Sequence, residues 1–263
     1  MEWSKRISES LQLFHKEPPC VLSREALLPF WDVTNLQENC DEASLAMTFA
    51  NAKMDSREQT RLEVQFAPVV CVYPKWVSYA VKMLAHTPTK VATVVNFPYG
   101  NAPQQAVGIQ LEEAIADGAS EIDVVFPYQA FLAGDKEQAY EFVSYCKSLC
   151  GSALLKVILE TGAFSDAALI AEAAILVAEC GADFIKTSTG KIAIGATFEA
   201  AVAILVAITE VRAKCSQMIG LKVSGGIRSV QAASQYHLLA ATLMGEKWLT
   251  PRHFRIGASQ LLV

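Results

Sequence analysis

Short apolar runs rich in β-branched residues alternate along the chain with segments whose hydrophobic positions recur at helical spacing. The runs start near Leu28, Pro68, Val91, Glu121, Leu154, Asp183, Gly220 and Phe254. The seven intervals between these starts average roughly 32 residues, about the length of one strand and one helix. Runs such as 69–72 and 91–95 are almost continuously apolar, as in parallel strands that helices cover on both faces.

Eight such units predict an α/β protein with a (β/α)8 TIM-barrel fold. The alternative is an open, doubly wound parallel sheet, which should have a glycine-rich turn after its first strand. The sequence Asp32-Val33-Thr34-Asn35 at that place contains no glycine. The pattern therefore favours the closed barrel.

The segments between the runs have helical signatures. Residues 105–117 and 166–180 place apolar side chains at helical spacing and are followed by Gly118 and Gly181, and residues 229–243 are followed closely by Gly245. Residues 1–27 precede the first strand and are predicted to form a helix and an extended Pro18-Pro19 segment lying over the barrel. Because no linker-like segment divides the chain, we predict one domain over 1–263 with this N-terminal extension.

Composition narrows the class of protein. The chain has 263 residues, is 52% hydrophobic and carries a net charge of −5, which excludes a disordered, collagen-like or disulfide-stapled protein. A slightly acidic chain without basic blocks is a poor candidate for nucleic-acid binding. An anionic substrate must therefore be held by a local site.

Seven cysteines form no CxxC pair, and no histidine lies at a zinc-ligand spacing beside them. This pattern predicts free thiols and no metal site. The N-terminus lacks the apolar segment of a signal peptide, and no apolar window has the roughly 20 residues that span a bilayer. We expect a cytoplasmic protein without a membrane partner.

Charged residues inside apolar strands are the informative anomaly. Asp123, Lys156, Lys186 and Lys222 interrupt four predicted strands, and Asp32 ends the first. Burying an unpaired charge costs several kcal/mol, so these groups should face one another inside the barrel. A single buried pair would most simply be structural, but five charges on five strands favour a catalytic site.

The excess of lysine suggests the reaction class. A lysine amine attacks a carbonyl only when it is neutral, and its ordinary pKa is about 10.4. A second ammonium nearby in a poorly solvated pocket lowers that pKa. Lys186 and Lys222 lie on predicted strands six and seven, so Schiff-base chemistry is the leading expectation.

Glycine-rich loops after the last two strands predict a phosphate site. Gly225-Gly226 follows strand seven, and Gly257-Ala258-Ser259 follows strand eight. Unblocked backbone N–H groups there form the usual barrel phosphate cradle, although a lone Gly-Gly pair would more simply be a turn. Lys191 and Arg228 can add positive charge. The segment 189–191 is not a Walker A loop because the spaced upstream glycine is missing.

Three motifs together resemble those of the deoxyribose-phosphate aldolases, the DeoC-type class I aldolases. They are DFIKTSTGK at 183–191, GLKVSGGIR at 220–228 and FRIGAS at 254–259, and the resemblance spans about residues 28 to 260. It implies a barrel enzyme that reversibly cleaves 2-deoxyribose 5-phosphate to acetaldehyde and glyceraldehyde 3-phosphate, in deoxyribonucleoside catabolism. It also implies that neither a metal nor an organic cofactor takes part.

The resemblance assigns roles to the charged strand residues. Lys186 matches the Schiff-base lysine, Lys222 the second lysine that perturbs it and takes part in proton transfer, and Asp123 the proton-relay carboxylate. The expected partners are small phosphosugar and aldehyde substrates, and a homodimer or homotetramer is the expected assembly. The expected substrate-binding residues are Asp32, Thr34, Thr189, Gly190, Lys191, Gly225, Gly226, Arg228, Gly257 and Ser259.

Three departures from the family pattern accompany these assignments. Gln260 replaces a small hydroxyl residue at the rim of the phosphate site, and Val223-Ser224 replaces the commoner Pro-Ala. The chain stops at Val263, whereas many relatives continue to a tyrosine thought to help proton transfer; slower enamine formation is the expectation. Two other hypotheses remain: a related Schiff-base aldolase for another aldehyde pair, and an inactive barrel that binds a ligand or partner.

Overall fold

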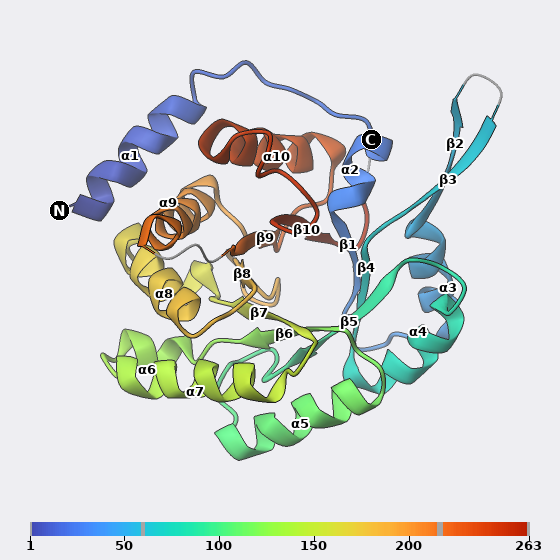
Figure 1. Ribbon diagram of the computed structural model, residues 1–263, viewed down its shortest axis with the longest axis horizontal. Helices are drawn as coiled ribbons and strands as arrows, with labels where there is room; N and C mark the ends of the chain where they lie inside the picture. The colour runs from blue at the N-terminus through green and yellow to red at the C-terminus, as the bar shows by residue number, and fades with distance from the viewer. Residues whose placement is uncertain (1, 59–60, 215–217, 262–263) are drawn as a thin grey trace.

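Eight parallel strands close into a barrel, and helices surround it (Figure 1). The computed structural model describes residues 2–58, 61–214 and 218–261. The strands around the barrel are ordered β1-β10-β9-β8-β7-β6-β5-β4, which is the predicted (β/α)8 TIM-barrel fold. Their bounds are β1 Trp31–Asn35, β4 Val69–Val72, β5 Lys90–Val95, β6 Glu121–Val125, β7 Leu154–Ile158, β8 Phe184–Lys186, β9 Gly220–Ser224 and β10 Phe254–Ala258.

The helices of the outer layer follow the strands in sequence. Two of the predicted helices begin at side-chain caps: the Asp166 carboxylate accepts from the Ala168 N–H, and the Ser229 hydroxyl accepts from the Ala232 N–H. The helices are α3 Glu42–Asn51, α4 Val77–Leu84, α5 Gln104–Ala116, α6 Tyr128–Leu132, α7 Lys136–Leu149, α8 Ala167–Glu179, α9 Phe198–Lys214 and α10 Val230–Met244, with 3-10 turns at Pro74–Trp76 and Thr161–Ala163.

The first strand begins later than the sequence pattern indicates. A strand start near Leu28 was expected, but residues Leu28–Phe30 form a 3-10 turn and β1 begins at Trp31. Pro29 is suited to the start of such a turn because it has no N–H to donate. Leu28 is nonetheless fully buried, so its apolar character reports burial and not strand geometry.

A two-stranded antiparallel hairpin was not predicted. Strands β2 (Lys53–Glu58) and β3 (Arg61–Phe66) pair with each other only, and Figure 1 shows them projecting away from the barrel. Their sequences, KMDSRE and RLEVQF, are largely polar. A search for continuously apolar runs finds strands buried on both faces, so it misses a strand pair of this kind.

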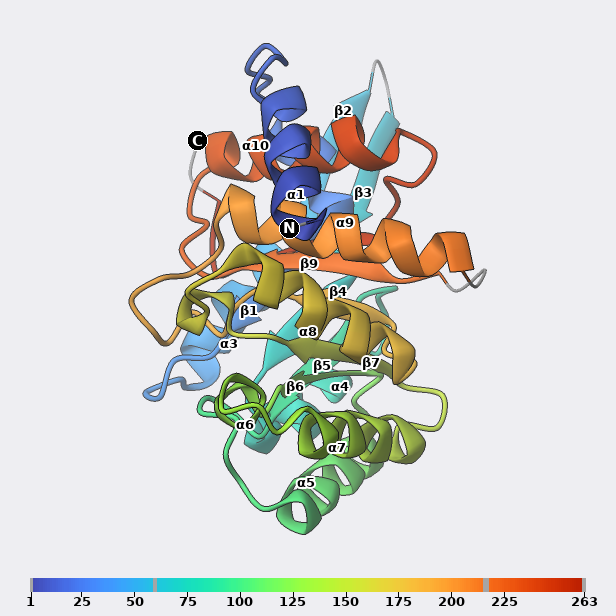
Figure 2. The ribbon, with the colours of Figure 1, turned by 90° about the vertical axis from the view of Figure 1, so that its left-hand side faces the viewer.

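The N-terminal extension packs on the outside of the helix layer. Helix α1 (Glu2–Phe14) lies against α8, α9 and α10, as Figure 2 shows, and the Phe14 ring lies 5.2 Å from that of Phe198. Arg6 pairs with Glu210 of α9 at 2.9 Å. The chain then returns along α10 to α2 (Arg24–Leu27), with the Leu22 N–H donating to the Ser234 hydroxyl. The extension thus covers outer helices and leaves the end of the barrel open.

The barrel interior is divided between an apolar and a charged half. On the β4–β5 side, Val69, Cys71, Ala92 and Val94 form a small hydrophobic cluster separate from the main core between barrel and helices. The opposite strands, together with β1, carry charged side chains into the interior. The site described below occupies this charged half.

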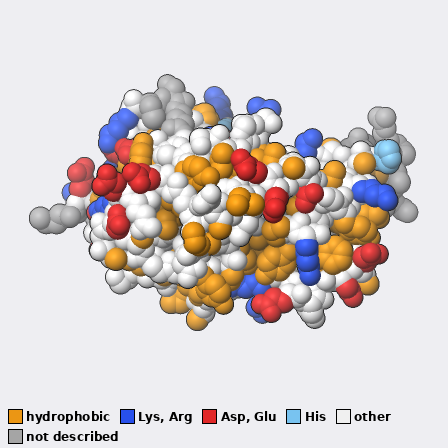
Figure 3. Space-filling model, turned by 90° about the horizontal axis from the view of Figure 1, so that it is seen from below, with side chains coloured by type: hydrophobic (Ala, Val, Ile, Leu, Met, Phe, Trp, Pro, Cys, Tyr) orange, Lys and Arg blue, Asp and Glu red, His pale blue; other side chains and the backbone are white. Residues whose placement is uncertain are grey.

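The helices and one face of the surface can be compared with the expectations for membrane and nucleic-acid binding. Among the described residues, no helix is long and apolar enough to cross a membrane. The face seen from below in Figure 1 mixes hydrophobic, acidic and basic side chains, and its few lysines and arginines lie apart from one another (Figure 3). A continuous basic patch, which a phosphate backbone would require, is not present on this face.

Candidate active site

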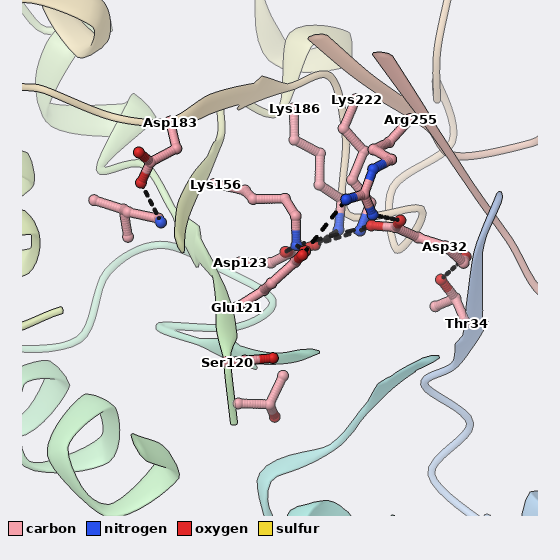
Figure 4. Close-up of polar contacts among 12 residues, drawn as sticks. Asp32, Thr34, Ser120, Glu121, Asp123, Lys156, Asp183, Lys186, Lys222 and Arg255 are labelled. Carbon is pink, nitrogen blue, oxygen red and sulfur yellow. Dashed lines mark hydrogen bonds and ion pairs between the residues drawn. The ribbon is translucent and has the colours of Figure 1, made fainter. Parts of the chain in front are cut away.

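Seven charged side chains from six strands meet inside the barrel, and each is at most 5% exposed. Figure 4 shows them converging from the surrounding strands. The five that the sequence predicted to face one another are among them, and the structure adds Glu121 and Arg255. The seven are Asp32 of β1, Glu121 and Asp123 of β6, Lys156 of β7, Lys186 of β8, Lys222 of β9 and Arg255 of β10.

Asp123 is the centre of this cluster. Lys156 donates to its Oδ1 at 2.8 Å, while Lys186 and Lys222 donate to its Oδ2 at 2.7 and 2.8 Å. The strand register explains the contacts, because Asp123 pairs with Lys156 across β6–β7 and Lys186 pairs with Lys222 across β8–β9. Neighbouring residues at one level of a parallel sheet point to the same side.

Asp32 forms a second centre beside the first. Its carboxylate lies 2.6 Å from Lys222 Nζ and 2.7 Å from Arg255. Lys222 therefore bridges the two aspartates. Lys156 lies 2.5 Å from Glu121 and 2.8 Å from Asp123, and so bridges the two acidic residues of β6.

The electrostatics of the cluster single out Lys186. Three carboxylates face four basic side chains, so the buried charges balance when one base is neutral. Burial lowers the pKa of Lys186, and the nearby Lys222 ammonium lowers it further against the opposing effect of Asp123. For Lys222, in contrast, Asp123 and Asp32 outweigh burial and raise the pKa. Lys186 is the base that is most readily neutral.

The charge of Asp123 is stabilised by its three lysine partners. Burial alone would raise the pKa of Asp123, but Lys156, Lys186 and Lys222 hold that pKa well below its ordinary value. The anionic form of Asp123 is thus favoured, and it contacts the amine of Lys186. A carboxylate in contact with a neutral amine and an ammonium can exchange protons with either.

A cavity of about 320 Å³ opens above the cluster at the carboxyl ends of the strands, the end at which barrel enzymes place their active sites. Lys186 is the member of the seven-residue cluster that lines it. The cavity also brings together nine of the ten predicted substrate-binding residues: Thr34, Thr189, Gly190, Lys191, Gly225, Gly226, Arg228, Gly257 and Ser259.

Two predicted substrate contacts have other partners. Asp32 does not line the cavity, because its carboxylate is fully buried beneath it against Lys222 and Arg255. A strand-end position does not distinguish a side chain that points into the cavity from one that points below it. Lys191 lies at the mouth, where its Nζ donates to the Leu36 carbonyl at 2.8 Å and lies 5.9 Å from the centre of the Tyr73 ring.

Close approach of two loops explains the glycine at position 225. Gly225 has a φ of +93°, and a Cβ there would lie 3.0 Å from Gly195 Cα and 3.1 Å from Ser188 Cβ. The Ala196 N–H donates to the Gly225 carbonyl at 3.0 Å. The loops after β8 and β9 are therefore joined backbone to backbone, and their exposed side forms one wall of the cavity.

Three buried charged residues near the site were missed by the sequence analysis. Glu121 and Arg255 lie within two of the predicted strands and would have been found by applying the charge-in-strand signal to every strand residue. Glu160 directly follows the apolar strand β7 and is fully buried. Only its position next to a strand end could have indicated a role.

The cysteines and possible metal ligands were also compared across the described part of the chain. No cluster of three or more His, Cys, Asp or Glu residues there could hold a metal ion. Cys71 lies inside the barrel, and burial raises the pKa of its thiol. The six described cysteines are free; Cys215 and the final residue, Val263, lie outside the described residues.

Comparison with known proteins identifies the family of this arrangement. The sequence model of the DeoC/LacD family of aldolases matches residues 38–245. Among solved structures, a Coccidioides immitis protein provisionally assigned as a deoxyribose-phosphate aldolase is 25% identical, with a TM-score of 0.74, over 98% of this chain and 93% of that chain.

Two further structures share the fold. A Toxoplasma gondii protein with the same provisional assignment is 24% identical, with a TM-score of 0.78, over 95% of this chain and 91% of that chain. The deoxyribose phosphate aldolase of Aeropyrum pernix, described as a tetramer, is 24% identical, with a TM-score of 0.67, over 96% of this chain and 93% of that chain. At this identity the likeness concerns the fold.

The buried position of Asp32 predicts a pH-dependent contribution to stability. Lys222 and Arg255 outweigh burial and hold the pKa of Asp32 at about 2, below its ordinary 3.8. A depressed carboxyl pKa stabilises the folded protein above about pH 4, and the contribution, on the order of 2 kcal/mol, is lost as pH falls toward 2. Asp32→Asn should therefore lower the melting temperature at pH 7. The difference in melting temperature between the wild-type protein and the variant should narrow as the pH is lowered.

Circular dichroism melts of both proteins from pH 7 downward measure the gap. Glu112→Gln, which removes an exposed carboxylate of α5, is the matched control and should show almost no gap. A gap for Asp32→Asn that stays constant down to the acid transition would contradict the ion-pair assignment.

Proposed function

Because the chain belongs to the DeoC/LacD family of aldolases, we propose that it is a class I aldolase acting through an imine on Lys186. The observation that carries the proposal is the setting of that lysine. It is the cluster member that lines the cavity, its pKa is lowered by burial, and it contacts the ionised Asp123 at 2.7 Å. A neutral amine facing a cavity is the form that attacks a carbonyl.

The proposed substrate is 2-deoxyribose 5-phosphate, which the enzyme cleaves reversibly to acetaldehyde and glyceraldehyde 3-phosphate in deoxyribonucleoside breakdown. The resemblance of the three strand motifs and the Coccidioides relative support this choice. The cavity supports it as well. Its lining combines Lys186 with Gly226, Arg228 and Ser259 of the glycine-rich loops, as suits an aldehyde joined to a phosphate.

In the proposed reaction the Lys186 amine adds to the C1 carbonyl of the open-chain sugar, and loss of water gives the imine. The C3 hydroxyl gives up its proton, the C2–C3 bond breaks, and its electron pair moves to the imine nitrogen to form an enamine. Glyceraldehyde 3-phosphate leaves with C3 as its aldehyde carbon. Protonation of C2 and hydrolysis then release acetaldehyde and regenerate Lys186.

Asp123 and Lys222 are the proposed proton carriers. Asp123 Oδ2 accepts from Lys186 and from Lys222 at once, so a proton can pass between the two amines through one carboxylate oxygen. Ordered water in the cavity can complete the path to C2. Lys156 lowers the pKa of Asp123, and Arg255 lowers that of Asp32, so both pairs favour the ionised aspartates.

Borohydride reduction in the presence of acetaldehyde tests the imine directly. The expected product is N-ethyl-lysine at position 186, because acetaldehyde forms the imine and hydride fixes it. Peptide mass mapping of the modified protein locates the adduct, and Lys186→Ala should form none at this site. An adduct at Lys222 instead would overturn the assignment of the nucleophile.

Substrate preference tests the phosphate end of the cavity. The value of kcat/KM for 2-deoxyribose 5-phosphate should exceed that for free 2-deoxyribose by at least about a hundredfold, since remote binding energy positions the reacting carbon. Coupled measurement of the aldehyde products gives both values. Equal values would exclude the phosphosugar and favour an aldolase for another aldehyde pair.

The acidic limb of the pH–rate profile tests the influence of Lys222 on Lys186. Removing a neighbouring ammonium raises the pKa of Lys186, and each unit lowers the neutral amine fraction about tenfold below that pKa. In Lys222→Leu the acidic limb of kcat/KM should therefore move to higher pH, with partial recovery of activity at alkaline pH.

The comparison uses kcat/KM from pH 6 to 10 with circular dichroism to confirm folding. Lys222→Arg, which keeps the positive charge beside the two aspartates, is the control. Its acidic limb of kcat/KM should lie closer to the wild-type pH than that of Lys222→Leu. A folded Lys222→Leu protein with near-normal activity at neutral pH would show that Lys222 only balances buried charge.

A further inference from the structure

The turn after β7 is built around a buried carboxylate to which the proposed reaction gives no part. Glu160 is fully buried and has φ and ψ of +59° and +56°, the left-handed conformation. A residue other than glycine is uncommon there, and such residues cluster at functional sites. The surrounding contacts must hold Glu160 in place.

Glu160 binds one residue of the neighbouring loop with both of its oxygens. Its Oε1 accepts from the Thr189 N–H at 3.2 Å, and its Oε2 accepts a short hydrogen bond from the Thr189 hydroxyl. The same hydroxyl oxygen accepts from the Lys191 N–H at 3.0 Å. One carboxylate thus fixes the backbone of a turn that contains Gly190.

Further contacts join the two loops on the same side. The Thr161 N–H donates to the Thr187 carbonyl at 2.9 Å, and the hydroxyls of Thr161 and Ser188 lie 3.3 Å apart. Gly162 lies so close to Ile194 that a Cβ would come within 2.1 Å of the Ile194 carbonyl oxygen. The turn at 160–162 is therefore a support on which the loop after β8 rests.

The partners of Glu160 differ from those of the catalytic cluster. Among the described ion pairs, none includes Glu160. Burial raises the pKa of its carboxyl, while the two Thr189 hydrogen bonds and, less strongly, the charge of Lys186 lower it. The described hydrogen bonds of its carboxylate go to Thr189 alone. Removing Thr189 donors would leave a buried carboxylate without partners, so the two residues act as a unit.

The supported loop forms one wall of the proposed phosphate end. Thr189, Gly190 and Lys191 line the cavity together with Gly226, Arg228 and Ser259 of the next two loops. Gly190 has a φ of +76°, and a Cβ there would lie 3.5 Å from Gly225 Cα. A small shift of the 189–191 turn would therefore change the spacing between the loop after β8, which carries Gly190, and the loop after β9, which carries Gly225.

We propose that Glu160 and Thr189 are a positioning pair that holds the 189–191 turn against Gly225 and thereby sets the affinity of the cavity for the substrate's phosphate group. The inference rests on the proposed function for the phosphosugar, but not on which lysine forms the imine. Neither residue transfers a proton in the reaction. Their effect reaches the substrate through the backbone of Gly190 and Lys191.

The test compares phosphate-dependent and phosphate-independent readouts in Glu160→Gln. The amide keeps the size of the side chain and one acceptor oxygen, but it cannot accept from both Thr189 donors with its two terminal atoms. The KM for 2-deoxyribose 5-phosphate and the inhibition constant of inorganic phosphate should each rise about tenfold, as for a lost hydrogen bond. Borohydride trapping of acetaldehyde on Lys186 should continue, because acetaldehyde has no phosphate.

Two variants of Thr189 and a charge control complete the design. Thr189→Val removes the hydroxyl at nearly constant shape and should weaken phosphate binding like Glu160→Gln, whereas Thr189→Ser keeps the hydroxyl and should restore it. Glu112→Gln, an exposed carboxylate on α5, controls for loss of one negative charge. If Glu160→Gln does not fold, the Thr189→Val and Thr189→Ser pair decides the question with the same measurements.

The outcomes separate this inference from the proposed function. If the wild-type protein neither prefers the phosphorylated sugar nor binds inorganic phosphate, the proposed substrate is wrong. If the wild-type protein does both, but Glu160→Gln and Thr189→Val bind phosphate as tightly as it does, the positioning role is overturned. Equal loss of phosphate binding and acetaldehyde trapping would also overturn it, because it would indicate a general disturbance of the site.

Discussion

The contact of one buried carboxylate with three lysines is the constraint on which the rest of the structure depends. Asp123 accepts from Lys156, Lys186 and Lys222 within 2.8 Å. Such a group is tolerable in a barrel interior only if its surroundings supply opposite charge in the right geometry, because an unpaired buried charge costs several kcal/mol. The closed parallel sheet supplies it by placing Lys156 level with Asp123, and Lys186 and Lys222 level with each other two residues further along the strands.

The need to pair the buried charges accompanies a division of the barrel interior into an apolar and a charged half, and the cavity lies above the charged half. The apolar half at β4 and β5 excludes water, which strengthens electrostatic interactions in the charged half. The loops above the charged half are joined to one another by backbone contacts, as at Gly225 with Gly195 and at Thr161 with Thr187. The joined loops thus form the entrance of a cavity whose base is the buried charged cluster. In such a cavity the loops can bind one part of a ligand while an amine of the cluster contacts its carbonyl group.

The sequence predicted the barrel and the charged strands because both rest on local patterns. Continuous apolar runs at regular spacing indicate buried parallel strands, and a lysine inside such a run is anomalous wherever the strand lies. The same reasoning could not place Asp32 below the cavity instead of in its lining, since that depends on the tilt of β1 relative to Lys222 and Arg255. It also missed the β2–β3 hairpin, whose residues are too polar to form an apolar run.

Glu160 is a second feature of the site that could not be predicted from the sequence. Its partners on Thr189 lie 29 residues away in the sequence, and no periodicity links a residue after one strand to a loop after the next. Only the left-handed turn that ends β7 aims its carboxylate at that loop.

Charge balance explains why Lys186, and not one of its neighbours, is the amine that we propose to react. Lys156 touches Glu121 and Asp123, and Lys222 touches Asp32 and Asp123, so each lies between two carboxylates. Lys186 contacts Asp123 alone among the described carboxylates and is also the lysine at the end of its strand, where the cavity begins. Deprotonating any one base neutralises the cluster, but deprotonating Lys156 or Lys222 would remove the cation between two carboxylates, whereas deprotonating Lys186 leaves Asp123 paired with Lys156 and Lys222. The amine that costs least to deprotonate is thus the one that faces the cavity.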